Sequence, residues 1–164
     1  MVIDMKNPYK SETGCCPKFN PKKWQNKTVK WKNKLFVKAR VKSFFHIPLN
    51  FGRVIGKLYE KIDKADAYSK EILMLSDENS LWGSNLYIEV KKRVKDTKIK
   101  KISGTFITKV FEGPYKDIKK WIKIMDVFVE SKGKKIKKLY FFYTTCPKCA
   151  KHYGKNYVVL IAKI

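Results

Sequence analysis

Residues 102–129 read ISGTFITKVFEGPYKDIKKWIKIMDVFV, and this stretch joins a strand pattern to a helix pattern. Its first ten residues are rich in β-branched and aromatic side chains, which predicts a strand over 102–111. Gly113 and Pro114 interrupt that pattern. Beyond them, apolar residues recur at spacings of three and four and predict a helix that ends at Gly133: Ile118, Trp121, Ile122, Met125, Phe128 and Val129.

The rest of the chain repeats this order of elements. Strands are expected at 139–145 and 157–164 after the helix just described. The first half predicts a strand over 35–47, a helix over 50–66 with Asn50 as its cap, and strands near 71–76 and 86–90. An offset of 67 residues places Phe51, Val54, Ile55, Leu58 and Ile62 on Ile118, Trp121, Ile122, Met125 and Val129.

These patterns predict an α/β (α+β) fold of two duplicated strand-helix-strand-strand units. The units would span about 35–93 and 102–164, share a mostly antiparallel sheet and place both helices on one side of it. Residues 1–34 are expected to form an irregular arm that Trp24 and Trp31 hold against this body. The seam between the repeats is the expected place for an apolar cleft.

Composition narrows the possible partners. The chain of 164 residues has no run of about 18 apolar residues and no apolar segment typical of a signal peptide at its start, so a cytoplasmic protein without a membrane partner is expected. The formal charge of +24 suggests nucleic acid. However, all but three of the 38 basic residues are lysines, and they are spread along the whole chain. A solvated lysine surface is therefore favoured over nucleic-acid binding.

A motif in the second half resembles a known family. Gly104-Thr105-Phe106, then 110–115 (VFEGPY), then Ile118 and Trp121 are similar to the signature of the GyrI-like small-molecule-binding domain family. That family includes the effector-binding domains of transcription activators, and this chain resembles a stand-alone member. The resemblance implies multidrug-type binding of bulky aromatic or cationic compounds in an aromatic cleft with an acidic residue. It also implies a possible hydrolase, because some stand-alone members hydrolyse strained cyclopropane-bearing natural products.

The acidic residue of that cleft has to be found elsewhere in this chain. Many family members carry a glutamate in the last strand, and residues 157–164 contain none. Glu89 is the first choice, because it shares a strand face with Tyr87, although a solvated glutamate is an equal alternative. Glu112 is a second candidate, with a helix-dipole role as its alternative.

Seven aromatic residues are expected near the cleft, where core packing is the alternative for each of them. They are Trp82, Tyr87, Phe106, Tyr115, Trp121, Phe141 and Tyr143.

The cysteines suggest a second kind of site. Cys146 and Cys149 have the spacing of a zinc knuckle, which Cys15 and Cys16, or one of them with His152, would have to complete. Reduced structural thiols are the favoured alternative, so no cofactor is expected and zinc is the minority hypothesis.

Three functions follow from the sequence. The first is binding of a small hydrophobic or cationic aromatic molecule between the repeats, for sequestration or sensing. The second is an enzyme, a hydrolase of small hydrophobic or xenobiotic compounds, in which Glu89 is the catalytic base. The third is a lysine-rich protein associated with nucleic acid.

Overall fold

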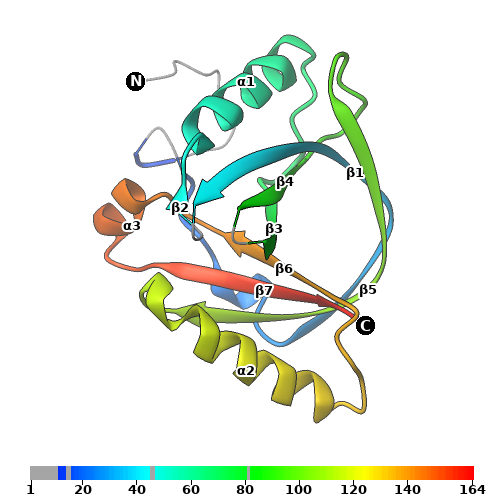
Figure 1. The fold of residues 1–164 in the computed structure, drawn as a ribbon, viewed down its shortest axis with the longest axis vertical. Coiled ribbons are helices and arrows are strands. Elements are labelled where there is room, and N and C mark those ends of the chain that lie inside the picture. The colour runs from blue at the N-terminus through cyan, green and yellow to red at the C-terminus, as the bar shows by residue number, and fades with distance from the viewer. Residues whose placement is uncertain (1–10, 14–15, 45–46, 81) are drawn as a thin grey trace. The chain divides into compact units, whose positions relative to one another are not determined.

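The computed structural model describes residues 11–13, 16–44, 47–80 and 82–164, and it consists mainly of strands (Figure 1). In chain order the elements are η1 (Pro21–Lys23), β1 (Lys27–Phe44), β2 (Ile47–Pro48), α1 (Phe51–Lys64), β3 (Met74–Ser80), β4 (Gly83–Glu89), β5 (Lys98–Glu112), η2 (Tyr115–Asp117), α2 (Ile118–Glu130), β6 (Lys138–Tyr143), α3 (Pro147–Tyr153) and β7 (Tyr157–Lys163). The chain divides into two compact units, Asn33–Ile102 and Lys10–Lys32 with Ser103–Ile164.

The first unit is built on antiparallel pairs. β1 pairs with β2 and with β4, and β4 pairs with β3. Val37 lies opposite Ile88, and both are buried beneath α1 against Leu58 and Ile62. The apolar stripe of α1 therefore covers one face of these strands, as its spacing predicts.

The start of α1 differs from the expected cap. Asn50 is the N-cap residue, but its side chain makes no hydrogen bond to the helix. Its Oδ1 atom instead accepts a hydrogen bond of 2.8 Å from the main-chain N–H of Lys42 on β1. Asn50 therefore ties the helix entry to the neighbouring strand.

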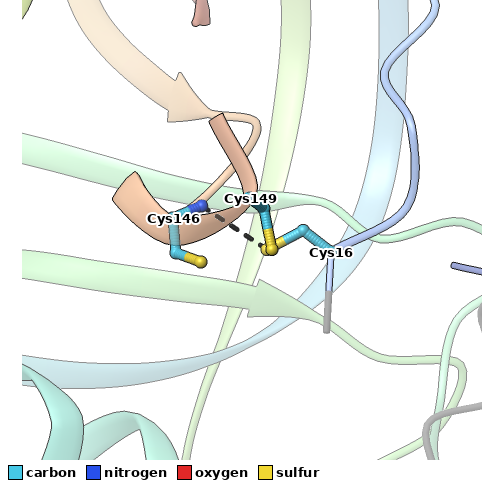
Figure 2. A group of neighbouring side chains, drawn as sticks. All are labelled: Cys16, Cys146 and Cys149. Carbon is cyan, nitrogen blue, oxygen red and sulfur yellow. Dashed lines mark hydrogen bonds between the residues drawn. The ribbon is translucent and has the colours of Figure 1, made fainter. Parts of the chain in front are cut away.

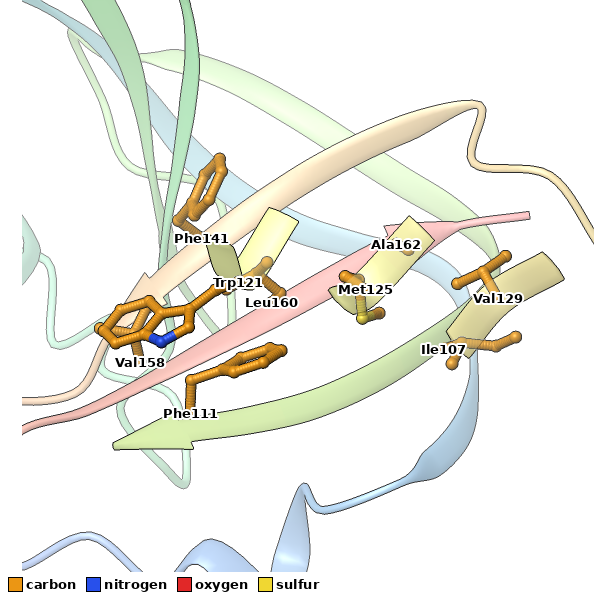
Figure 3. Packing of buried hydrophobic residues seen from close by; sticks show 9 residues of the cluster. All are labelled: Ile107, Phe111, Trp121, Met125, Val129, Phe141, Val158, Leu160 and Ala162. Atoms are coloured by element: carbon orange, nitrogen blue, oxygen red, sulfur yellow. The ribbon is translucent and has the colours of Figure 1, made fainter. Parts of the chain in front are cut away.

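In the second unit β7 pairs with both β5 and β6, and α2 packs on one face of these three strands (Figure 1). Trp121, Met125 and Val129 of the helix are buried, as predicted. They pack on alternate residues of the strands, shown in Figure 3: Ile107, Phe111, Phe141, Val158, Leu160 and Ala162. The helix ends at Glu130, three residues before Gly133, whose positive φ of 69° suits a glycine.

The arm contacts the opposite face of the same strands. Trp31 packs against Phe106 with ring centroids 4.4 Å apart, and Trp24 packs against Phe142 at 5.8 Å. Gln25 Oε1 accepts a 2.8 Å hydrogen bond from the N–H of Val110. Trp24, Gln25 and Trp31 therefore hold this part of the chain against the strands.

The predicted α/β (α+β) fold, in which duplicated strand-helix-strand-strand units share a mostly antiparallel sheet with both helices on one side, is wrong. β1 and β5 are 18 and 15 residues long, and β1 pairs with β5 in addition to its other neighbours. This extra pairing joins β5, at one end of the strand order, to β1, next to the other end, which is the connectivity of a closed antiparallel β-barrel. A sheet covered by helices on one side does not have this closure. The described residues contain three α-helices, all short, so the fold is mostly β.

The start of the first strand was also predicted incorrectly. It begins at Lys27, eight positions before the expected residue 35, inside the segment predicted to be irregular. Val29 and Trp31 are half-buried there, whereas the alternating Lys30 and Lys32 are exposed. A period of two was thus present, but it covers only four residues and was taken for part of the irregular arm.

Two further features concern the helices. α3 forms within the loop expected between the last two strands, so the Cys146-to-Cys149 segment is the start of a helix. Among the described residues, no helix has both the length and the apolar composition that crossing a membrane requires.

Candidate functional site

Three cysteine side chains converge in the second unit (Figure 2). Cys16 comes from the arm, Cys146 is the N-cap of α3, and Cys149 lies in its first turn. All three sulfur atoms lie within 4.8 Å of one another, an arrangement that could hold a metal ion. Cys15, the other residue that the sequence suggested for this place, lies outside the described residues.

Hydrogen bonds orient these sulfurs. The main-chain N–H of Cys146 donates to Cys16 Sγ over 3.4 Å, the dashed line in Figure 2. The Thr13 hydroxyl lies 3.3 Å from Cys149 Sγ. The main-chain oxygen of Cys16 accepts hydrogen bonds from Ser11 Oγ and from the Tyr153 hydroxyl, each 2.7 Å long. Groups from both the arm and α3 therefore fix the position of Cys16.

The environment of Cys149 favours its thiolate. Burial raises the pKa of the Cys149 thiol, because a buried charge loses its hydration. Hydrogen bonds from Thr13, Cys146 and Cys16 act in the other direction and bring the pKa down to about 7. Since the thiolate is the form that coordinates metals, Cys149 is suited to be a metal ligand.

In the first unit, Glu89 is the last residue of β4 and is sheltered from solvent. Its Oε1 atom lies 2.6 Å from Lys34 Nζ, and its side chain is 15% exposed. Tyr87, two residues earlier on the same strand, projects from the same face and packs edge-on against Phe36. Glu89 therefore lies on the same face of β4 as the buried ring of Tyr87.

The other acidic candidate has a different setting. Glu112 ends β5 in the second unit, and its side chain is 50% exposed. Its Oε1 atom lies 3.8 Å from Lys155 Nζ, a partly exposed ion pair of the kind that adds little stability. Glu112 therefore has the surroundings of a surface residue.

The predicted aromatic residues fall into separate groups. Trp82 and Tyr87 belong to the first unit, where Trp82 is 59% exposed and Tyr87 is buried. In the second unit, Phe141 stacks on Tyr143 at 6.3 Å, and Tyr115 meets Tyr143 edge-on at 5.4 Å. Tyr115 is 42% exposed, so this group reaches the surface.

Two of the predicted aromatic residues have core positions. Trp121 lies beside this group, but it is buried and stacks on Phe111 at 5.6 Å. Phe106 projects from the opposite strand face, where it contacts Tyr140 and Trp31. The structure thus brings Tyr115, Phe141 and Tyr143 together and separates Phe106 from them.

Sequence reasoning missed the residues that support each site. Lys34 was assigned to the arm, although its position in β1 places its ammonium against Glu89. Ser11, Thr13 and Tyr153 were not singled out, yet all three make hydrogen bonds around the cysteines. The alternation of apolar residues and lysines in 29–32 was the available signal that Lys34 lies in a strand. No local sequence pattern places Ser11, Thr13 and Tyr153 beside the cysteines.

Solved structures resemble this fold. A hydrolase from Listeria innocua superposes with a TM-score of 0.61 at 14% sequence identity, covering 85% of this chain and 91% of that chain. An uncharacterised conserved protein from the same organism gives 0.61 at 15% identity, with 84% and 91% covered. A third structure, SAV2435 bound to tetraphenylphosphonium, gives 0.49 at 10% identity, with 85% and 93% covered.

The sequence comparisons give the family. No curated protein shows significant sequence similarity to the chain. The family described as "Bacterial hydrolase" matches residues 6–164, nearly the whole length. The chain therefore belongs to this bacterial hydrolase family.

Proposed function

We propose that the protein hydrolyses small hydrophobic or aromatic molecules and that Glu89 is the general base. Membership of the bacterial hydrolase family over residues 6–164 supports the reaction class. The GyrI-like signature at 104–121 supports a small aromatic or cationic compound as the substrate. The observation that carries the proposal is the sheltered carboxylate of Glu89, at the end of the strand that also carries the buried ring of Tyr87.

Glu89 has the exposure that the reaction needs. At 15% exposed, its side chain is much less hydrated than those of Glu60 and Glu112, at 61% and 50%. A carboxylate with few water neighbours is a more effective partner for a single bound water molecule.

Lys34 completes the proposed chemistry. Its ammonium lies 2.6 Å from Glu89 Oε1, which leaves Oε2 to accept a proton from water. As that proton moves to Oε2, the water oxygen forms a bond to the electrophilic carbon of the substrate. The displaced electron pair goes to the leaving atom, and the Lys34 charge stabilises negative charge that develops nearby.

Product analysis in isotopically labelled water tests the proposal. The full chain is incubated with aryl esters, epoxides and cyclopropane-bearing compounds in H₂¹⁸O, and products are analysed by mass spectrometry. Hydrolysis is expected to add one labelled oxygen to the product. Glu89→Gln keeps the shape of the side chain and is expected to lower turnover by about 10²–10⁴-fold, the usual contribution of a general base.

Glu60→Gln is the matched control. Glu60 lies on the exposed side of α1 and pairs with Lys64 at 2.7 Å, so it is a lysine-paired glutamate outside the proposed site. Its replacement should leave turnover unchanged. Turnover that persists in Glu89→Gln, or wild-type protein that produces no labelled product from the panel, would reject the proposal.

Binding without turnover is the second candidate. The short contact between Lys34 and Glu89 favours it, because one carboxylate oxygen is already engaged. In this case the protein would sequester or sense the compound. Calorimetric titration would then show saturable binding to a compound that the wild-type protein leaves unchanged.

A further inference from the structure

We propose that Cys16, Cys146 and Cys149 bind one Zn²⁺ ion, which fastens the arm to the start of α3. The three sulfur atoms already lie within 4.8 Å of one another. Zinc–thiolate bonds of about 2.3 Å in a tetrahedron place sulfurs about 3.8 Å apart, so only a small contraction is needed. This inference is independent of the proposed hydrolysis, because it concerns other residues and metal binding instead of catalysis.

The ligand type selects the metal. Thiolates are soft ligands that favour Zn²⁺ over the oxygen-seeking Mg²⁺ and Ca²⁺. Cys146 and Cys149 have the two-residue spacing of a zinc knuckle, and Cys16 brings the third sulfur from a segment 130 residues away. A disulfide would engage two of these sulfurs and leave the third without a role, whereas a metal ion engages all three.

The surroundings already suit bound thiolates. The N–H of Cys146 donates to Cys16 Sγ, and the Thr13 hydroxyl lies in position to donate to Cys149 Sγ. Hydrogen bonds to ligand atoms of this kind orient them and support their negative charge. The two hydrogen bonds to the main-chain oxygen of Cys16 hold the third ligand in place before metal binds.

The three cysteines differ in their exposure to solvent. Cys149 is fully buried, whereas Cys16 and Cys146 are half-buried. Zn²⁺ prefers four ligands, so a site with three protein thiolates leaves a fourth position for water or an external ligand. Because Cys16 and Cys146 are half-buried, the three residues lie close to the protein surface.

Metal analysis of the untagged full chain tests the proposal. Protein prepared under reducing conditions with ZnCl₂ and then desalted is expected to retain one zinc ion per chain. Replacement by Co²⁺ should give the visible absorption bands of tetrahedral cobalt together with thiolate charge transfer. Cys16→Ser, Cys146→Ser and Cys149→Ser should each abolish retention.

Two further variants distinguish a specific zinc site from nonspecific zinc binding. Thr13→Val removes the hydroxyl beside Cys149 and is expected to weaken zinc binding by about 10–100-fold, as loss of a supporting hydrogen bond does. Lys148→Ala changes an exposed residue between two ligands and should retain zinc fully. Reduced wild-type protein that retains no zinc, or equal retention in Cys149→Ser, would overturn the proposal.

Discussion

The hydroxyl of Tyr153 donates a 2.7 Å hydrogen bond to the main-chain oxygen of Cys16, although the two residues are 137 positions apart. Tyr153 is the last residue of α3, and Cys16 lies in the arm that continues to Trp24 and Trp31. The same oxygen accepts a hydrogen bond from Ser11. The course of the arm is therefore coupled to the helix between β6 and β7 even without a metal.

Tyr153→Phe should loosen this attachment. The variant keeps the ring and removes one hydrogen bond, so the free energy of unfolding should fall by about 0.5–1.5 kcal/mol. Amide hydrogen exchange should become faster in residues 16–24 and stay unchanged in α2. Equal acceleration in both segments would show that the bond supports the whole unit and not the arm in particular.

The core beneath α2 gives a test of the fold. Met125 is fully buried, whereas Val127, two residues later on the same helix, is 67% exposed. Met125→Ala should lower the free energy of unfolding by about 2–5 kcal/mol, because it leaves a cavity. Val127→Ala should change it by about 0.5 kcal/mol or less. Denaturant titration of both variants measures the contrast, and similar losses would contradict this placement of the helix.

The two helices were predictable because their signal is local. Spacings of three and four in 118–129 identify the face of α2 that packs on the strands. The closed strand connectivity was not predictable in this way, because the pairing of β1 with β5 joins distant parts of the chain. The beginning of β1 was also missed, because the alternation at 29–32 is short.

In the candidate sites, too, local motifs were predictable and contacts between distant parts of the chain were not. The spacing of Cys146 and Cys149 is a local motif, but the convergence of Cys16 on them depends on the path of the arm. The ion pair of Lys34 with Glu89 depends on the register between β1 and β4. Phe106 was grouped with Phe141, whereas pairing through β7 places the two on opposite faces. A difference of one residue in strand register decides such a face.

The net charge of +24 leads to a prediction about nucleic acid. Duplex DNA should bind without sequence preference, and its affinity should fall by about 10³-fold or more between about 50 and 200 mM salt, because the contacts are to phosphates. Fluorescence anisotropy with two unrelated duplexes measures both properties. A sequence preference that survives at the higher salt concentration would instead support a specific nucleic-acid function.

Charge at Glu89 should matter for ligand selection. If an aromatic cation binds beside this carboxylate, Glu89→Gln should weaken its binding and leave that of a neutral compound of the same shape nearly unchanged. Trp82 precedes the opposite end of β4, so Trp82→Ala, which removes a 59% exposed ring, should leave the affinity for both compounds nearly unchanged. Calorimetric titration with Glu60→Gln as the control measures these differences. Equal affinity of wild type and Glu89→Gln for the cation would place the binding site elsewhere.

Removal of zinc should release the arm without unfolding the rest of the second unit. The core beneath α2 contains no cysteine, so its packing does not depend on the metal. Lys18, Lys22 and Lys23 are exposed in the arm just after Cys16, and trypsin should cleave there faster once a chelator has removed the metal. Far-ultraviolet circular dichroism should change little. Cys16→Ser should show the fast cleavage with or without chelator, whereas Lys148→Ala should behave as wild type in both conditions. Loss of all secondary structure on chelation would instead mean that the metal holds the whole unit together.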